Sequence, residues 1–307
     1  METTVIDQRN ARLSIADRRL RIETPNASPR FIPLAMIQRL IVIASVELEA
    51  RVLTRLAEQG AYLLFLSPRD LRRTAIVAPP FGGNHAVRIA QYKSATNART
   101  SADIARIIVR MKLLAQIRTL RAMTRHHPKT RTALRRLPEL NQVLSTCPTI
   151  EQIGGIEGGA AAMYFAALAE QFPSSLGFAQ RRRRPPPDPV NALLSLGYTL
   201  LHFDAVRSLH MAGLDPCIGF LHQPAYNRES LACDCIEPLR PIVDRFVWQL
   251  FRRRILRGTH FADQQGACKL GKAGRLIFYR EWEAFAPIPR RALRRGTTLL
   301  RKHLAAR

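Results

Sequence analysis

The chain has 307 residues, of which 47% are hydrophobic, so it can bury one large core or two modest ones. Its formal net charge of +25 favours a polyanionic partner, nucleic acid before a membrane surface. It contains neither an apolar run of about 18 residues nor a cleavable leader, and its five cysteines lack a framework spacing, so we expect a reduced, cytoplasmic protein without membrane spans.

The first 80 residues show the short alternating pattern of β-strands. Apolar residues alternate at Leu13 and Ile15 and again at Leu20 and Ile22, on either side of a turn, which predicts a hairpin. Further strands are expected at 30–34, 40–44, 61–67 and 72–78, and one helix at 46–60, closed by Gly60. The sequence PPFGGN then breaks the pattern. We predict a small β-rich N-terminal domain over 1–80, with a role in dimerisation and assembly, and a linker over 81–87.

Positive charge is concentrated beyond this domain. Residues 1–80 carry 12 Lys and Arg against 8 Asp and Glu, a balance of +4, which leaves +21 for residues 81–307. We therefore expect nucleic acid to contact the second part of the chain. Because 42 of the 48 basic residues are arginine, an arginine-rich genome is an alternative source of the charge.

The pattern from residue 87 to 122 is helical, with apolar side chains on one face and basic side chains on the other. Arg110 and Lys112 are candidate DNA-binding residues on the basic face, although a merely solvated face is the alternative. The apolar face is expected to consist of Ile104, Ile107, Ile108, Met111, Leu114 and Ile117.

Further helices are expected at 157–172, 191–212 and 230–256. Pro238 and Pro241 should kink the last helix or divide it in two. The sequence thus predicts an α+β protein, in which the small β-rich domain precedes a larger all-α catalytic domain over 88–290 and a basic C-terminal tail over 291–307.

One histidine and two acids stand where a divalent metal could be held. His222 lies in a loop, and Asp234 and Glu237 lie three residues apart in a run expected to be helical, so both carboxylates leave one face. Imidazole plus carboxylates suits Mn²⁺ or Mg²⁺ with open water positions, as phosphodiester chemistry requires. The alternative is a helix-capping loop with an ordinary solvated acidic face.

A third acid, Glu157, stands between two pairs of glycines. Its neighbours indicate that it lies where a helix begins and where small residues let other chains approach closely. The alternative for Glu157 is a structural one, since a carboxylate at a helix start is favoured by the helix dipole.

The segment RRRRPPPDP (181–189) is basic and rich in proline, which is typical of an extended loop. Such a loop could lie along a phosphate backbone, and a disordered linker is the alternative. Behind it, Asn191 and Tyr198 lie seven residues apart on one expected helical face, where Tyr198 could equally be a core residue. The candidate DNA-binding residues of the segment are Arg181, Arg182, Arg183 and Arg184.

Four blocks of this chain resemble the CRISPR-associated integrase and endonuclease family, the spacer-acquisition protein Cas one. They occur in the family's order and together cover most of residues 5–250. The blocks are RNARLSIADRRLRIET with its continuation to residue 67, GGIEGGAAAMYFAAL (154–168), RRRRPPPDPVNALLSLGYTLL (181–201) and GLDPCIGFLHQPAYNRESLACDCIEPLRPIVDRF (213–246).

The resemblance implies a set of site residues. Glu157, His222 and Glu237 match the family's ligands for Mg²⁺ or Mn²⁺. Asp234 is assigned a supporting role that orients or tunes the site, with direct ligation left open, and Asn191 and Tyr198 are expected nearby. The departures from the family pattern, which include Gln223 and Cys217, spare the ligands.

The resemblance also implies the function of a metal-dependent DNA endonuclease and integrase. Such proteins join short foreign DNA to the CRISPR repeat array by transesterification. They act on duplex and branched DNA as asymmetric homodimers, together with the small ferredoxin-like partner Cas two. The alternatives are a non-catalytic nucleic-acid-binding assembly subunit and a metal-dependent RNA-processing nuclease.

Overall fold

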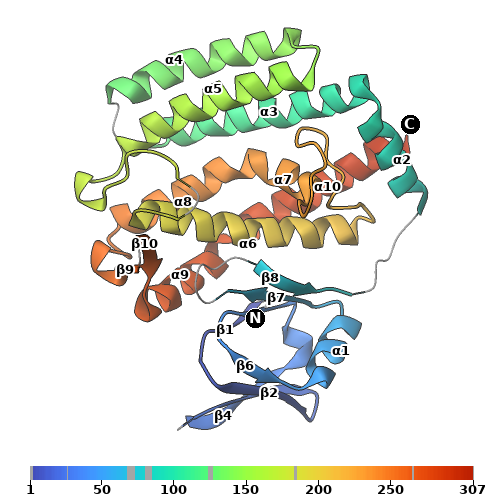
Figure 1. Cartoon of the computed structure of the whole chain (residues 1–307), viewed down its shortest axis with the longest axis vertical. Helices are drawn as coiled ribbons and strands as arrows, with labels where there is room; N and C mark the ends of the chain where they lie inside the picture. Colours follow the sequence, from blue (N-terminus) through green and yellow to red (C-terminus); the bar gives the residue numbers. More distant parts are fainter. Residues whose placement is uncertain are drawn as a thin grey trace. The chain divides into compact units, whose positions relative to one another are not determined.

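The computed structural model describes residues 3–25, 27–67, 73–79, 85–123, 127–182, 185–264 and 266–306. The chain divides into two compact units, residues 1–82 and 83–307. The first unit consists mainly of β-strands and the second mainly of helices (Figure 1), which confirms the predicted fold class. In the described part of the chain, no helix combines the length and the apolarity that a membrane span requires.

The described strands of the first unit form two sheets. One has the strand order β1-β5-β7-β8 and the other the order β4-β3-β2-β6. Leu13 lies opposite Ile22 and Ile15 opposite Leu20 in the antiparallel pair of β2 and β3, which confirms the predicted hairpin. The strands are Thr3–Ile6 (β1), Ala11–Ala16 (β2), Arg19–Thr24 (β3), Ala27–Pro33 (β4), Arg39–Val42 (β5), Val46–Leu48 (β6), Tyr62–Leu66 (β7) and Arg73–Val77 (β8).

The core of the first unit draws on both sheets and on helix α1 (Ala50–Glu58). Leu13, Leu40, Leu56 and Leu63 are fully buried there, and each such leucine stabilises the fold by roughly 1.5–3 kcal/mol. The core explains the alternation in β2 and β3, because Leu13, Leu20 and Ile22 point into it.

The helix predicted from residue 46 begins later than expected. Residues 46–48 form strand β6, which pairs in parallel with β2. These residues form a strand and not a helical turn because they pair with the edge of β2 that β3 does not occupy. Helix α1 starts at Ala50, and Gly60, with a φ of 76°, follows its end as predicted.

The second unit is built mainly of helices (Figure 1). Helices α3, α4 and α5 pack on one another, α6 packs against α7, α8 and α10, and α3 also contacts α8, which joins the two groups. The helices are His85–Thr96 (α2), Ala98–Arg121 (α3), Pro128–Val143 (α4), Ile150–Ala169 (α5), Pro189–Met211 (α6), Ser230–Ile236 (α7), Arg240–Arg252 (α8), Lys272–Phe285 (α9) and Pro287–Ala305 (α10), with a 3₁₀ turn at Glu237–Leu239 (η4) and a hairpin of Phe261–Gln264 (β9) and Ala267–Leu270 (β10).

The helix predicted over 87–122 is two helices. They meet at Asn97, whose side chain accepts a hydrogen bond of 2.9 Å from the Thr100 N–H and thereby caps α3. His85, expected in the linker, already belongs to α2, and residues 81–84 of that linker lie outside the described residues. The predicted division near Pro238 and Pro241 is confirmed, since η4 separates α7 from α8.

The residues predicted as a basic tail are largely helical. Residues 291–305 belong to α10, whose Leu293 and Leu304 are buried, and the helix packs against α2 and α6. The sequence reading missed this because numerous arginines obscure a sparse apolar stripe. Helices α4 and α9 were also not predicted, and the β9–β10 hairpin means that the second unit is not wholly helical.

Candidate functional site

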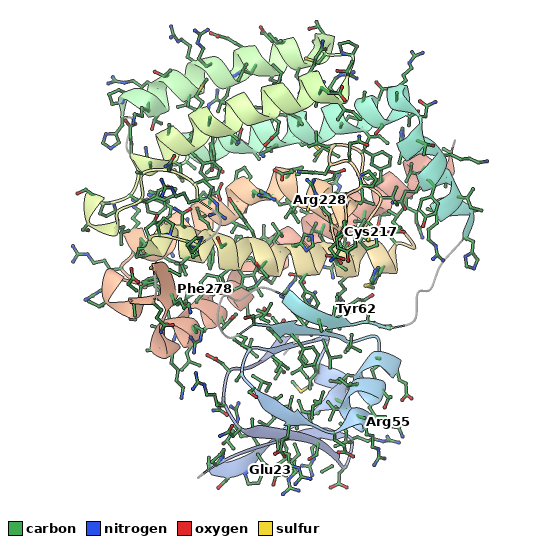
Figure 2. All side chains as sticks on the ribbon, in the orientation of Figure 1. Glu23, Arg55, Tyr62, Cys217, Arg228 and Phe278 are labelled. Atoms are coloured by element: carbon green, nitrogen blue, oxygen red, sulfur yellow. The ribbon has the colours of Figure 1, made fainter. Side chains whose placement is uncertain are left out.

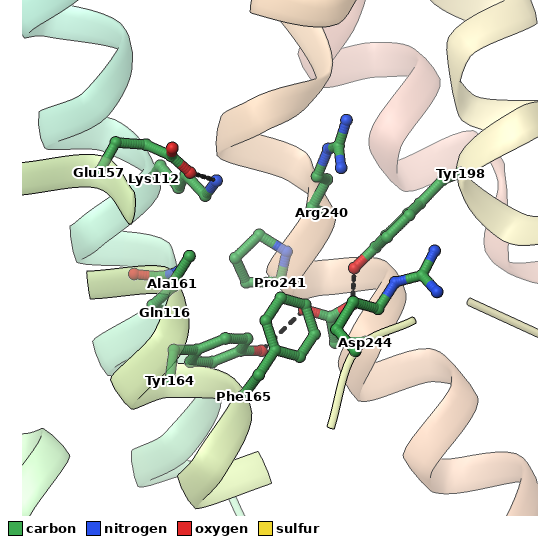
Figure 3. A pocket seen from close by; sticks show the side chains of 11 residues that line it. Lys112, Gln116, Glu157, Ala161, Tyr164, Phe165, Tyr198, Arg240, Pro241 and Asp244 are labelled. Carbon is green, nitrogen blue, oxygen red and sulfur yellow. Dashed lines mark hydrogen bonds and ion pairs between the residues drawn. The ribbon is translucent and has the colours of Figure 1, made fainter. Parts of the chain in front are cut away.

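Two of the predicted metal ligands meet at a lysine. The Lys112 Nζ on α3 donates to Glu157 Oε1 on α5, and it donates to Glu237 Oε2 on η4 at 2.5 Å. Figure 3 shows Lys112 and Glu157 facing each other. Lys112 and Glu237 are both buried. Acids from two distant segments therefore converge on a single cation position.

The expected apolar face of α3 is confirmed at Ile104 and Ile117, which are buried, but the prediction is wrong for other residues. Lys112 was predicted on an exposed basic face, yet its side chain points into the unit, while Ile107 and Met111 of the predicted core face are more than half exposed, at 56% and 53%. The inward turn of Lys112 is stabilised by its two carboxylate partners, because a buried ammonium needs compensating charge. Arg110 does lie on the exposed surface of α3.

Glu157 does not lie at a helix start. Helix α5 begins at Ile150, after the N-cap Thr149, so Glu157 projects from its third turn. The glycines on either side of Glu157 do not interrupt the helix, and a Cβ at any of them would meet nothing within 4 Å. Because these glycines have no side chains, the helix surface beside Glu157 is open.

Asp234 holds the loop that carries His222. Its Oδ2 accepts hydrogen bonds from the N–H groups of Phe220 and Leu221, at 2.7 and 3.0 Å. Its Oδ1 accepts from the His222 N–H at 3.0 Å and lies 2.7 Å from the His222 ring Nδ1. With Nδ1 engaged, Nε2 is the ring nitrogen that remains for a ligand. Gly219 permits this packing, because a Cβ there would lie 2.9 Å from Asp234 Oδ2.

A buried glutamine, which the sequence reading missed, holds the same loop from the other side. The Gln91 Nε2 on α2 donates to the carbonyl oxygens of Asp215 and Ile218, at 2.9 and 2.8 Å, and its Oε1 accepts from the Asp215 N–H at 2.9 Å. Cys217 and Arg228, labelled in Figure 2, belong to this loop. No local pattern signals the role of Gln91, because its partners are more than a hundred residues away.

Glu157 also lines a pocket (Figure 3), together with residues that the sequence reading did not single out. The Tyr164 hydroxyl donates to Asp244 Oδ2 at 2.9 Å, and the Tyr198 hydroxyl donates to Asp244 Oδ1. Burial raises the pKa of Asp244 to about 6. The pocket is lined by Lys112, Gln116, Glu157, Ala161, Tyr164, Phe165, Arg181, Tyr198, Arg240, Pro241 and Asp244.

Arg240 links this pocket to the acids. Its Nη2 lies 3.1 Å from Glu237 Oε1, and its guanidinium lies over the Tyr198 ring, 4.9 Å from the centroid. Burial raises the pKa of Glu237, but the charges of Arg240 and Lys112 outweigh burial and hold that pKa below its usual range. Glu237 is therefore an ionised carboxylate at neutral pH.

Asn191 fixes the start of the basic proline-rich segment. Its Oδ1 accepts from Arg181 Nη1 and from the Arg182 N–H, both at 2.9 Å, and its Nδ2 donates to the Gln180 carbonyl oxygen at 2.9 Å. Arg181 is thereby held at the pocket, while Arg182 is exposed. The other two arginines of the predicted DNA-binding set, Arg183 and Arg184, lie outside the described residues.

The donors suit a divalent metal in type, and part of the set is already gathered. Glu157 and Glu237 share one cation position at Lys112, and Asp234 orients the ring of His222. As the described side chains stand, no three His, Cys, Asp or Glu residues enclose a metal position. Carboxylates and one imidazole fit Mg²⁺ or Mn²⁺ better than Zn²⁺ in a closed site.

The chain matches known proteins over nearly its full length. The family model for CRISPR associated protein Cas1 matches residues 4–284. A CRISPR-associated endonuclease Cas1 of Thermodesulfovibrio yellowstonii is 36% identical over 291 residues, which cover 92% of this chain and 91% of that protein. The match places the chain among CRISPR-associated proteins. It belongs to the Cas1 family.

Solved structures share its fold. A Cas1 protein from Thermotoga maritima aligns with a TM-score of 0.89 and 23% identity over 99% of this chain and 97% of that one. A casposase bound to an integration product aligns with a TM-score of 0.84 and 19% identity over 99% and 91%. A chain of a Cas6-RT-Cas1–Cas2 complex aligns with a TM-score of 0.84 and 21% identity over 98% of this chain and 34% of that one.

Proposed function

We propose that this chain is a metal-dependent DNA endonuclease and integrase of CRISPR adaptation, which joins short foreign DNA to the repeat array by transesterification. The observation that carries the proposal is the convergence of Glu157 and Glu237 on one cation position, in a unit where Asp234 holds the His222 loop. Membership of the Cas1 family supports the biological setting.

Mg²⁺ or Mn²⁺ is the proposed cofactor, held by Glu157, Glu237 and the Nε2 of His222. When bound, such an ion polarises a phosphoryl oxygen and stabilises the attacking and leaving oxygens of a phosphodiester. Asp234 orients His222 and occupies its ring Nδ1, so that Nε2 is the nitrogen left for the ion. Glu237 contributes a carboxylate that is ionised at neutral pH, because Arg240 stands beside it.

Arginine side chains would bind the DNA. Arg181 and Arg240 line the pocket beside the acids, where guanidinium groups can neutralise a phosphate as charge develops on it. Exposed Arg110 and Arg182 would contact the backbone further away, and Arg183 and Arg184 would extend the same basic segment. In strand joining the nucleophile is a DNA 3′-hydroxyl, and in nicking it is water.

The active assembly is proposed to be a homodimer that acts in the cytoplasm with the small partner Cas2 on duplex and branched DNA. The casposase bound to an integration product and the Cas6-RT-Cas1–Cas2 complex, which share the fold, support these partners. The five cysteines, which lack a framework spacing, support a reducing compartment.

Alanine substitution of the proposed ligands tests the function. Glu157→Ala, His222→Ala and Glu237→Ala should each abolish metal-dependent cleavage and strand joining, while DNA affinity measured without metal remains close to that of the parent protein. Thermal unfolding should shift down in Glu157→Ala and Glu237→Ala, because each substitution removes a carboxylate partner of the buried Lys112. Glu139→Ala is the control, because Glu139 pairs with Arg136 on the exposed surface of α4. Full activity in any one ligand variant would remove that residue from the site.

The substrate separates this function from the alternatives. Single-stranded RNA, duplex DNA and branched DNA should be compared with Mn²⁺ present. We expect strand joining and cleavage on branched and duplex DNA. Turnover of RNA alone would identify an RNA-processing nuclease, and tight binding of all three without turnover would identify a non-catalytic assembly subunit.

A further inference from the structure

A lysine stands where the two candidate ligand carboxylates meet. Lys112 donates to both Glu157 and Glu237, and its side chain is only 8% exposed. Any cation that bridges these carboxylates must bind the oxygens that the ammonium now binds. A divalent ion and the Lys112 ammonium therefore compete for one position.

The charges of this cluster balance without a metal. Glu157 and Glu237 carry two negative charges, and Lys112 and Arg240 carry two positive ones. A divalent ion added beside the undisplaced ammonium would leave two uncompensated positive charges among largely buried groups, where charges repel strongly. The ammonium has to leave as the ion enters.

A glutamine one turn along α3 offers the displaced ammonium a partner. Gln116 is 1% exposed and lines the pocket beside Lys112, and its Oε1 has no hydrogen-bond donor among the described residues. Residues four apart on a helix are neighbours, so the Lys112 ammonium can turn from the carboxylates towards Gln116. The same movement brings it into the pocket that Arg181 and Arg240 also line.

We propose that Lys112 is an exchangeable counter-ion of the metal site. Its ammonium neutralises Glu157 and Glu237 in the metal-free protein, turns towards Gln116 when a divalent cation binds, and then pairs with a DNA phosphate in the pocket. The inference rests on the proposed function for the identity of the cation and of the DNA. Its consequence is cooperative binding of metal and DNA, because the phosphate supplies a new partner for the displaced charge.

Mn²⁺ affinity measured by electron paramagnetic resonance, with and without duplex DNA, tests this exchange. Lys112→Gln should bind Mn²⁺ at least ~5-fold more tightly than the parent without DNA, and Gln116→Leu should bind it more weakly. DNA should raise the Mn²⁺ affinity of the parent ~5-fold or more beyond any rise that it causes in Lys112→Gln, because both proteins keep the contact between the ion and the phosphate. Lys112→Arg is the control that keeps the charge. Equal or weaker Mn²⁺ binding by Lys112→Gln would overturn the inference.

Labelling of the unmodified protein gives a second test that needs no variant. Reductive methylation followed by mass spectrometry reports the exposure of each of the six lysines. Lys112 should be modified slowly without metal and ~5-fold faster or more with saturating Mg²⁺, because the bound ion displaces its ammonium from the two carboxylates. Exposed Lys129 on α4 should react at one rate throughout. Unchanged protection of Lys112 at saturating Mg²⁺ would contradict displacement.

The two proposals fail in different ways. If the Mn²⁺ and labelling effects are observed but no DNA strands are joined, the counter-ion exchange is supported and the integrase function is contradicted. If strands are joined but Lys112→Gln leaves the Mn²⁺ affinity unchanged, the integrase function is supported and the counter-ion exchange is contradicted.

Discussion

Asp234 Oδ1 lies 3.0 Å from the backbone nitrogen of His222 and 2.7 Å from its ring Nδ1, so one carboxylate oxygen sets both the loop and the ring. Asp234 itself is fully buried, and its other oxygen accepts two further backbone hydrogen bonds. The geometry makes Asp234 a positioning residue for His222.

Asp234→Asn is therefore expected to weaken the site without removing it. An amide keeps one acceptor oxygen but turns its NH₂ group towards backbone donors, so the loop loosens. Mn²⁺ affinity should fall by about 10–100-fold, the usual effect of altering a group that orients a ligand. Strand joining should recover at high Mn²⁺. Complete loss that no Mn²⁺ concentration restores would mean that Asp234 ligates the metal directly.

Gln91→Ala should disturb the same loop from a distance. The substitution removes three hydrogen bonds to the loop backbone, at a cost of about 2 kcal/mol in the free energy of unfolding. Urea unfolding measures that cost, and Mn²⁺ affinity should fall with it, because His222 loses its fixed position. Gln142→Ala is the control, since Gln142 is exposed on α4. Undiminished Mn²⁺ affinity in Gln91→Ala would contradict a positioning role.

Asp244 should make stability depend on pH. Burial raises its pKa from 3.8 to about 6, so between these values the folded protein binds more protons than the unfolded one. The contribution of Asp244 to the free energy of unfolding therefore falls as pH rises from about 4 to 6, by at most about 3 kcal/mol. The free energy of unfolding is measured by urea unfolding at several pH values. In Asp244→Asn it should lack the part of the decline between pH 4 and 6 that Asp244 causes.

Glu139→Gln provides the comparison for Asp244→Asn, because Glu139 is an exposed carboxylate on α4. Its profile of stability against pH should match that of the parent. An Asp244→Asn profile that also parallels the parent from pH 4 to 7 would show that Asp244 does not titrate in this range.

Arg182→Glu should weaken DNA binding mainly through charge. Arg182 is exposed beside the pocket-lining Arg181, and removal of one phosphate contact should lower the slope of log affinity against log salt by about 1. A fluorescence titration of branched DNA at several salt concentrations measures this slope, and sedimentation should show the same association state as the parent. Arg55→Glu on α1 is the control, since Arg55 pairs with exposed Glu58 in the first unit. Equal salt slopes for both variants would count against a DNA contact at Arg182.

Several elements of this fold were predictable because local residues decide them. The hairpin of β2 and β3 follows from alternating apolar residues, the end of α1 from Gly60, and the break between α7 and α8 from Pro238 and Pro241. The acids and the histidine of the candidate site were also recognisable as residue types that bind metals.

Residue types are enough to show which side chains could carry the chemistry, but how these side chains meet depends on contacts between distant segments. Lys112 joins Glu157 and Glu237 across 45 and 125 residues, and Gln91 reaches Asp215 across 124. Helical periodicity placed Lys112 on the wrong face, because the pattern of one helix carries no information about two buried carboxylates on other segments. Their charge favours an inward ammonium over an inward isoleucine or methionine, and only packing of α3 against α5 and η4 brings that charge within reach.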